Sequence, residues 1–409
     1  MAHTPDVQHF IDDGEVVQVA RDLVRIPSIT HREGRGIADY LERWFRDLGI
    51  PVRTYPADGD RVNFFADYGA ATGPRRYLIN GHQDTKPTGA MTVEPFAAEI
   101  RDGRMYGRGA CDMKSGLSAM LCAFKALVRA GVKPRGGITF YSDIEEEYGG
   151  PAGMGEMLKR GMLDGFEGLV SGEPTGLEIQ IGNRGGMATA FETIGRAAHS
   201  GIAHRGVNRH PDVCAHTSGT PGNAIIHMAR FIREFLELSY LTLENPWFGK
   251  STVNFEKIAG GNYLSAVPDR CIVCLDTRFI PETPPELVRK QITGLIERLR
   301  REEGITIREV NQPVDWRPPG GEPLAAAFIP PNHPLVERAK QAYRKALGSK
   351  PKISGCPGAT IAGLMIRRGT PAIICGPGDI AQAHTDDEWI AVEEIPKAAR
   401  LYAELMAGM

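Results

Sequence analysis

The sequence has little of what marks a protein that works in membranes or on nucleic acids. No apolar run approaches the roughly 18–20 residues that cross a bilayer, and a net charge of −2 predicts no strongly basic surface. Residues 1–13 are polar and acidic, unlike the apolar core of a signal peptide. The seven scattered cysteines favour reduced thiols. We therefore expect a cytoplasmic protein with no membrane or nucleic-acid partner.

Two common catalytic signatures are also missing. The chain has no Gly-x-Ser-x-Gly elbow of a serine hydrolase and no P-loop for a nucleotide phosphate. Cys271 and Cys274 form a Cys-x-x-Cys pair, but they lie in a strand-like run where residues three apart point to opposite faces. The absences disfavour a serine hydrolase and a nucleotide-driven enzyme, and the Cys-x-x-Cys pair is a poor metal or redox site.

Apolar periodicity predicts an α/β fold with an insertion. Strands expected at 63–68, 76–80, 137–142 and 168–170 alternate with helices at 115–130, capped by Ser115, and 151–160, which indicates a mostly parallel central sheet. Residues 91–107 look irregular. The pattern becomes α+β beyond Asn183, with helices at 223–238 and 285–301, and α/β again beyond Pro313. We expect one α/β domain at 1–183 and 314–409, interrupted by an α+β domain at 184–313.

Several predicted strands end in residues that bind metals. His82 follows the strand at 76–80, and Asp84 can accept a hydrogen bond from its ring. An acidic run such as 145–147 is more often a solvated loop, but this one follows a buried strand. Together the histidines and carboxylates suit zinc, with cobalt or manganese as substitutes. The ligand candidates, enough for two ions, are His82, Asp112, Glu147, Glu173 and His384. Glu146 is left over as a general base.

The chain resembles the M20 family of metallopeptidases and amidohydrolases, which includes acetylornithine deacetylase, succinyl-diaminopimelate desuccinylase and glutamate carboxypeptidase. The resemblance spans most of the chain and rests on motifs in the family's order. They are Gly-His-Gln-Asp at 81–84, Gly-Arg-Gly-Ala-Cys-Asp-Met-Lys-Ser-Gly at 107–116, Glu-Glu-Glu-Tyr-Gly-Gly at 145–150, Ser-Gly-Glu-Pro-Thr at 171–175, Ala-His-Ser-Gly at 198–201, and Gly-Pro-Gly-Asp at 376–379 before Ala-His-Thr at 383–385.

The resemblance implies a role for each residue of the site. Asp112 is expected to bridge two Zn²⁺ ions, one completed by His82 and Glu173 and the other by Glu147 and His384. Glu146 is implied as the general base, Asp84 as the carboxylate that orients His82, and a metal-bridging hydroxide as the nucleophile. The peptide bond between Asp112 and Met113 is implied to be cis.

The inserted domain resembles the family's lid, which forms the interface of a homodimer. His199 is implied to reach the partner's active site and stabilise the oxyanion, although a plain loop histidine is the alternative. Arg278 is implied to bind a substrate carboxylate, and the alternative is a strand arginine paired with a surface acid. Gly358 is a further candidate for substrate contact.

Some segments depart from the family's pattern. Glu145 replaces the usual aspartate, the segment at Ser265 lacks an asparagine, and 355–360 lacks a Thr-Asp pair. Residues 209–222 look like an extra surface loop, close to His199; with the stretch before it, this part of the lid holds His204, His210 and His216. These departures leave substrate recognition open.

We predict a dinuclear zinc hydrolase that cleaves the amide bond of an N-acyl amino acid, like a deacetylase or desuccinylase. The alternatives are a dipeptidase or carboxypeptidase of the same family and a hydrolase of a specialised amide. A non-catalytic metal-binding relative is disfavoured, because a metal holder has no use for the base Glu146.

Overall fold

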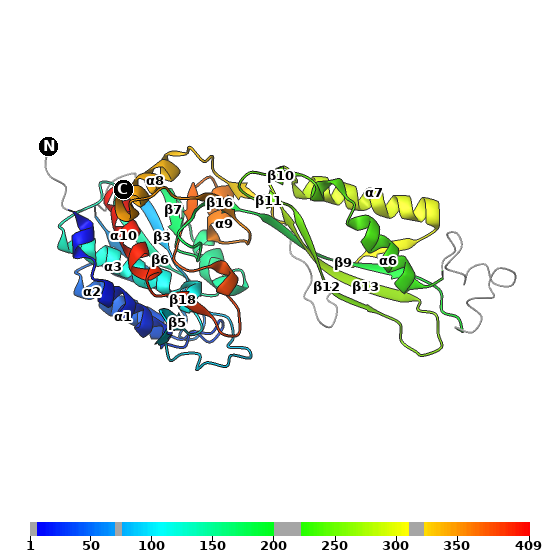
Figure 1. Ribbon diagram of the computed structural model, residues 1–409, viewed down its shortest axis with the longest axis horizontal. Helices are drawn as coiled ribbons and strands as arrows, with labels where there is room; N and C mark the ends of the chain where they lie inside the picture. The colour runs from blue at the N-terminus through cyan, green and yellow to red at the C-terminus, as the bar shows by residue number, and fades with distance from the viewer. Residues whose placement is uncertain (1–5, 70–75, 200–221, 311–322) are drawn as a thin grey trace. The chain divides into compact units, whose positions relative to one another are not determined.

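The computed structural model describes residues 6–69, 76–199, 222–310 and 323–409 (Figure 1). The chain forms two compact units, one of Met1–Asn183 with Phe328–Met409 and one of Arg184–Ala327. The domain boundary that the sequence predicts at 313/314 lies outside the described residues, as do His204, His210, His216 and nearly all of the loop at 209–222. No helix in the described part of the chain has the length and apolarity of a membrane span.

The first unit is built on a nine-stranded sheet whose centre is parallel. The inner strands β6, β3, β7 and β17 run parallel, whereas β1, β2 and β8 run antiparallel to the next strand inward. This confirms the predicted α/β class. In order across the sheet the strands are β1 (Val52–Pro56), β2 (Val62–Tyr68), β6 (Ile138–Ser142), β3 (Arg76–Asn80), β7 (Phe166–Ser171), β17 (Ala372–Ile374), β8 (Ile179–Asn183) and β15 (Ala327–Phe328), with β16 (Ile353–Cys356) beside β8.

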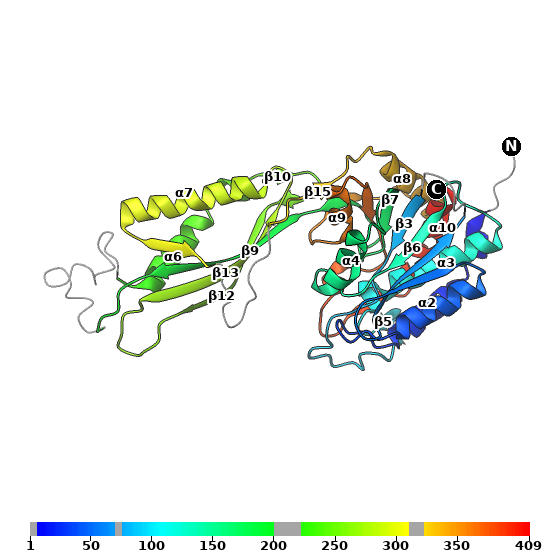
Figure 2. The same ribbon diagram turned by 180° about the vertical axis from the view of Figure 1, so that it is seen from behind.

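Helices cover both faces of this sheet because its side chains alternate between them. On β6, Phe140 meets Phe45 and Phe124 on one face, whereas Tyr141 stacks on Phe65 toward the other. The first face carries α1 (Asp13–Val24), α2 (Gly36–Asp47), α3 (Ser115–Arg129), α8 (Pro334–Leu347) and α10 (Glu394–Ala407), and the second α4 (Glu156–Lys159) and α9 (Ile361–Arg367) (Figures 1 and 2).

A small sheet lies where the sequence indicates only irregular structure. β4 (Glu99–Arg101) and β5 (Arg104–Tyr106) form a hairpin, and β18 (Trp389–Ala391) pairs with β5. The hairpin turns at Asp102 and Gly103, both with positive φ, which is the Asp-Gly signature of a tight turn. Three-residue strands are too short to show a periodicity, so the expectation of an irregular segment is wrong here.

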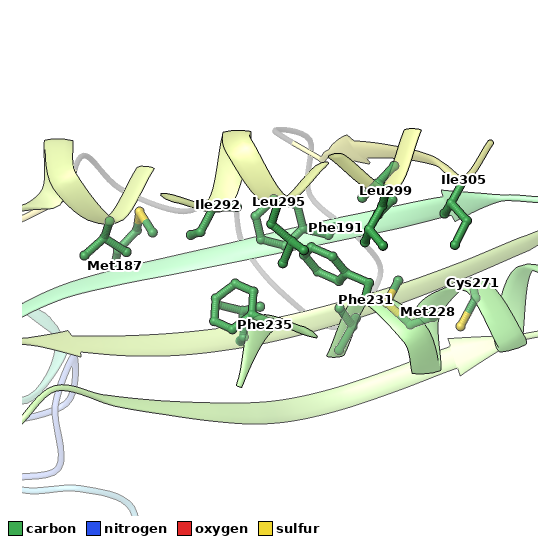
Figure 3. Packing of buried hydrophobic residues seen from close by; sticks show 14 of the residues in the cluster. Met187, Phe191, Met228, Phe231, Phe235, Cys271, Ile292, Leu295, Leu299 and Ile305 are labelled. Carbon is green, nitrogen blue, oxygen red and sulfur yellow. The ribbon is translucent and has the colours of Figure 1, made fainter. Parts of the chain in front are cut away.

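The second unit is an antiparallel sheet covered on one face by two helices. Its strands, in order, are β12 (Thr252–Gly260), β13 (Arg270–Phe279), β9 (Gly185–Ile194) and β14 (Thr306–Glu309), with a hairpin of β10 (Glu244–Asn245) and β11 (Gly249–Lys250) outside it. Phe191 of β9 packs against Phe231 of α6 (Ala224–Phe235) and Leu295 of α7 (Pro285–Glu303) in one apolar core (Figure 3). The α+β pattern of the insertion is therefore observed.

Candidate metal centre

The ligand candidates gather at one edge of the central sheet of the first unit. His82 lies two residues after β3 and Glu173 two residues after β7, and Glu147 lies in the turn η3 (Glu146–Tyr148) beyond β6. Parallel strands bring their carboxyl ends to the same edge, which explains why these three meet. Asp112 comes from the turn η2 (Ala110–Lys114), and His384 from the segment before β18.

Asp112 lies between the two histidines. Its Oδ1 is 3.0 Å from Nε2 of His82, and its Oδ2 is 3.3 Å from Nε2 of His384. His384 Nε2 also lies 2.8 Å from Glu147 Oε2, and His82 Nε2 lies 3.7 Å from Glu173 Oε2. One carboxylate therefore offers an oxygen to each of two ligand pairs.

The pKa shifts of the site residues show which groups would lose a proton when a cation binds. Burial raises the pKa of Glu173 to about 7, and it raises the pKa of Glu146 well above its usual value, with Glu173 adding to the effect. Hydrogen bonds to Asp112 and Glu147 raise the pKa of His384 to about 9. For Asp112, hydrogen bonds from His384 and His82 outweigh burial and keep the pKa low. Burial thus favours the protonated forms of Glu173 and Glu146, and a bound cation would favour their ionised forms.

The residues fit two divalent cations. Three carboxylates and two imidazoles supply oxygen and nitrogen ligands suited to zinc, cobalt or manganese. Glu173 Oε1 is buried and makes no hydrogen bond with any residue that the structure describes. Ligand atoms of His82 with Asp112 and Glu147, and of His82 with Glu146 and Glu173, lie within 4.8 Å of one another. We call His82, Asp112, Glu147, Glu173 and His384 the metal centre.

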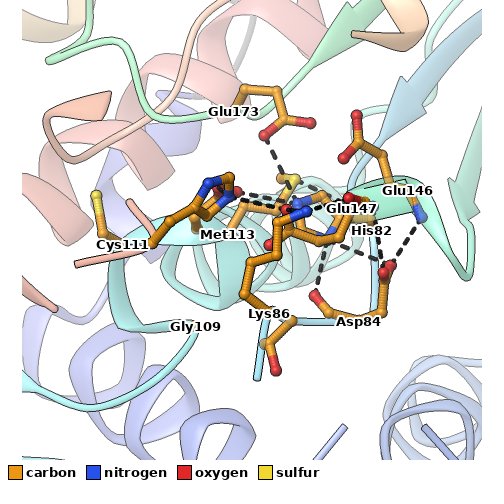
Figure 4. Close-up of polar contacts among 12 residues, drawn as sticks. His82, Asp84, Lys86, Gly109, Cys111, Met113, Glu146, Glu147 and Glu173 are labelled. Carbon is orange, nitrogen blue, oxygen red and sulfur yellow. Dashed lines mark hydrogen bonds and ion pairs between the residues drawn. The ribbon is translucent and has the colours of Figure 1, made fainter. Parts of the chain in front are cut away.

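His82 makes its hydrogen bond to the backbone carbonyl of Asp84 and not to the carboxylate that the sequence predicts. His82 Nδ1 donates to the backbone carbonyl of Asp84 at 2.9 Å and lies 3.6 Å from its carboxylate. That bond leaves Nε2 of His82 for a metal. The carboxylate accepts from Thr30 Oγ1 at 2.8 Å and from the backbone N–H groups of Glu146 and Glu147 at 3.1 and 3.3 Å (Figure 4). Asp84 therefore orients both the histidine and the acidic turn.

The carboxylate of Glu146 lies beside the metal centre, with an oxygen within 4.8 Å of ligand atoms of His82 and Glu173. Asp84 holds its backbone N–H, and its own carboxylate points away from Asp84 toward the side where Glu173 lies (Figure 4). Glu145, which stands where the family usually has an aspartate, contacts other residues. It contacts His31 Nδ1 at 2.9 Å and accepts from the backbone N–H of Ala152 at 2.8 Å. The carboxylate of Glu145 is thus bound by residues outside the metal centre.

The turn that presents Asp112 is buried and has the expected cis peptide between Asp112 and Met113. Ser115 does not cap α3 as predicted. Its Oγ donates to the carbonyl of Ala110 at 2.6 Å, because the turn η2 runs directly into the helix.

Sequence reasoning missed two residues that support this centre. Glu388 accepts hydrogen bonds from the turn that carries Asp112. Lys86 contacts the backbone carbonyl of Glu147, lies 3.4 Å from its Oε2, and sits over the ring of Tyr148. Lys86 is four residues from His82 in the same loop, and this short spacing is the sequence feature that could have identified it.

The remaining predicted residues are not among the contacts of the metal centre that the described residues show. His199 and Arg278 belong to the second unit. His199 is exposed and forms a backbone bridge with Ala266, and Arg278 Nε donates to Asp276 at 2.7 Å. Gly358 belongs to the first unit, where its carbonyl accepts from Asn183 Nδ2 at 2.8 Å.

A helix-flanked, largely parallel sheet with histidines and carboxylates at one edge is typical of metal-dependent enzymes. Residues 78–408 match the family described as Peptidase family M20/M25/M40, so the chain belongs to this family. It is therefore a hydrolase of amide or peptide bonds, in a family that depends on metal ions.

Comparisons with individual proteins agree with this assignment. The chain is 28% identical to the N-formyl-4-amino-5-aminomethyl-2-methylpyrimidine deformylase of Bacillus subtilis (strain 168), over 96% of this chain and 94% of that protein. Its fold is similar to that of a tripeptidase from Staphylococcus aureus subsp. aureus Mu50, with a TM-score of 0.75, 21% identity, and coverage of 97% and 98% of the two chains. It is also similar to a dinuclear metal-binding M20 peptidase from Bacillus subtilis, with a TM-score of 0.67, 16% identity, and 97% of each chain covered.

Proposed function

We propose that this hydrolase is a dinuclear zinc enzyme that removes the acyl group from an N-acyl amine, with N-acyl amino acids and N-formyl amines as the substrate classes to examine first. The observation behind the proposal is the position of Asp112, which offers one carboxylate oxygen to each of two histidines. A bridging carboxylate of this kind is typical of co-catalytic metal pairs. The similarity to a deformylase along nearly the whole chain supports an acyl group over a peptide.

In the proposed reaction, some residues would bind the metal ions and another transfers the proton. His82 and Glu173 would hold one ion, Glu147 and His384 the other, and Asp112 both. The bound ions would polarise the amide carbonyl and lower the pKa of water. Glu146 accepts the proton of the attacking water and gives it to the leaving amine, because its carboxylate lies beside His82 and Glu173 and is not assigned to either ion.

We also propose that the enzyme is a homodimer in which the second unit acts as lid and interface. β12 is an edge strand of its sheet, and most of its residues are exposed. A mostly exposed edge strand is suited to pairing with a second copy. His199 of the partner subunit would then stabilise the developing oxyanion. We also expect the enzyme to be located in the cytoplasm.

A hydrolysis screen of the zinc-loaded protein tests this function. The panel holds N-acetyl and N-succinyl amino acids, an N-formyl aminopyrimidine, dipeptides and tripeptides, each with and without a chelator. We expect cleavage of an N-acyl compound that the chelator abolishes. Faster cleavage of the peptides would replace deacylation by peptidase action, and turnover that survives chelation would contradict the metal mechanism.

A substitution at Arg278 distinguishes a substrate that carries a carboxylate from one that does not. A guanidinium binds a carboxylate through two parallel hydrogen bonds, which lysine cannot reproduce. We expect Arg278→Lys to raise KM for N-acyl amino acids and to leave KM for a substrate without a carboxylate unchanged. An equal effect on both substrates would mean that the arginine has only the structural role shown by its bond to Asp276.

A further inference from the structure

Glu388 is a buried carboxylate that holds the turn of Asp112. Its Oε1 accepts from the backbone N–H groups of Cys111 at 2.8 Å and Asp112 at 3.0 Å. Its Oε2 accepts from Gly109 N–H at 3.1 Å and from Arg108 Nη1 at 2.8 Å. The residue is 1% exposed. All of these donors come from the segment around the bridging ligand, so the carboxylate fixes the position of that ligand's backbone.

The same residue connects this turn to the segment that carries His384. Glu388 lies four residues after His384, and its carbonyl accepts from the N–H of Gly107 at 3.0 Å. Arg108 completes the connection, because its Nη2 donates to the carbonyl of Thr385 at 3.0 Å. The spacing between His384 and Asp112 therefore depends on Glu388 and Arg108.

The two ligand pairs differ in what else holds them. His82 and Glu173 follow β3 and β7, which are neighbours in the sheet and fixed by its ladder. His384 lies in an irregular segment at φ 63°, and its side chain is 48% exposed. Loss of the Glu388 contacts would loosen the His384 side of the metal centre and leave the side built on the sheet in place.

We propose that Glu388 is a positioning residue that holds Asp112 and His384 at the spacing needed for the second metal ion, the one assigned to Glu147 and His384. The proposal rests on the dinuclear centre proposed above. Removing residues that support metal ligands typically costs 10–100-fold in metal affinity. The cost is expected to be larger on this ion, which depends on both Asp112 and His384, than on the ion held by His82 and Glu173, which shares only Asp112.

Cobalt titration of the metal-free protein tests the proposal without using activity. Calorimetry counts the ions and measures each affinity, and visible absorption reports the geometry around each Co²⁺. We expect two Co²⁺ per wild-type chain. Glu388→Gln presents an amide NH₂ where an acceptor is needed, so we expect the ion assigned to Glu147 and His384 to bind about 10–100-fold more weakly, with an altered spectrum, and the other ion to lose less affinity.

Arg108→Met is the second variant, because it keeps the carboxylate and removes only one of its donors and the contact to Thr385. We expect a smaller loss on the same ion, and this variant decides the matter if Glu388→Gln does not fold. Glu404→Gln is the matched control. Glu404 is also a buried carboxylate, held by Gln8 and Lys345, and no residue of the metal centre is among these partners.

The outcomes separate the positioning role from the metal centre itself. Two ions in the wild type and unchanged affinities in both variants would overturn the role of Glu388 alone. An equal loss of both ions would overturn it too, because it would show general damage to the fold. A wild-type chain that takes up no Co²⁺ would overturn the dinuclear centre and the role of Glu388 together.

Discussion

At the scale of single residues, Glu146 is the side chain whose removal separates catalysis from metal binding. Its backbone is fixed by Asp84, but its carboxylate is not one of the ligands assigned to either ion. We expect Glu146→Gln to keep both ions and to lower kcat by about 10²–10⁴-fold or more, the usual range for a lost general base. Metal analysis and steady-state kinetics check this.

The neighbouring Glu145 provides the control for that experiment. Its carboxylate contacts His31 and Ala152 instead of the metal centre. Glu145→Asp restores the residue that the family usually has, and we expect kcat within a few-fold of the wild type. Near-normal turnover in Glu146→Gln would remove Glu146 as the base.

Metal affinity should depend on pH through His384. Its pKa of about 9 in the metal-free protein means that the ring is protonated at neutral pH, whereas a metal ligand must be neutral. Binding therefore releases a proton below pH 9, and affinity should rise as the pH rises from 6 toward 9 and level off above it. Calorimetry in buffers of different ionisation enthalpy counts the protons. Binding that releases no proton at pH 7 would contradict this.

The sequence identifies ligands more readily than the residues that support them. His82 and Glu173 follow apolar runs directly, so strand ends reveal them. Glu388 gives no such signal, because its role depends on four donors that only the fold brings to it. The same holds for the Asp84 carboxylate, whose contacts to the acidic turn join residues about sixty positions apart.

At the scale of elements, the close approach of α3 to the end of β7 explains a glycine in the Asp112 motif. A Cβ at Gly116 would lie 2.5 Å from the carbonyl oxygen of Gly172, the residue before Glu173. We expect Gly116→Ala to lower the free energy of unfolding by about 1–3 kcal/mol, the usual cost of overpacking, and to weaken the ion bound at Glu173. Denaturant unfolding and cobalt titration measure the two effects.

Gly294 is the matched control in another helix. It is an exposed residue in the middle of α7, and a Cβ there would meet nothing within 4 Å. Gly294→Ala should therefore stabilise the protein by about 0.5–1 kcal/mol, because alanine loses less backbone entropy in a helix. If both substitutions had the same sign, close packing would not be the reason for Gly116.

Long elements are predicted well because many residues contribute to each pattern. The expected helices at 115–130 and 285–301 begin where α3 and α7 begin and end within two residues of their last residues. Short elements and helix ends depend on a few local contacts, and there the predictions are wrong. β4 and β5 are missed, and Ser115 bonds to Ala110 instead of capping its helix.

At the scale of the whole molecule, the order of the elements predicts an insertion. The sequence changes from an α/β pattern to an α+β pattern and then returns to the α/β pattern. The two compact units show the same interruption, with the second beginning at Arg184. Assembly is different, because a surface that meets a second copy has no periodicity of its own. The dimer therefore stays a proposal based on the resemblance and on the exposed strand β12.

Mixing two inactive variants tests the assembly and the role of His199 together. In His199→Ala each active site keeps Glu146 but lacks the oxyanion group from its partner, and in Glu146→Ala each site lacks the base. Both homodimers should be nearly inactive. In a hybrid, one of the two sites combines an intact Glu146 with an intact His199 of the partner subunit. Random exchange makes about half of the dimers hybrid, so about a quarter of wild-type activity should return.

The recovery distinguishes a residue that acts in the partner's site from one that acts in its own or only shapes its loop. If His199 worked within its own subunit, no hybrid site would hold both groups, and mixing would restore nothing. The exchange itself is checked by mass measurement of differently tagged subunits. Hybrids that form without activity would leave the dimer in place and confine the action of His199 to its own subunit, either in the active site or through the loop that bridges to Ala266.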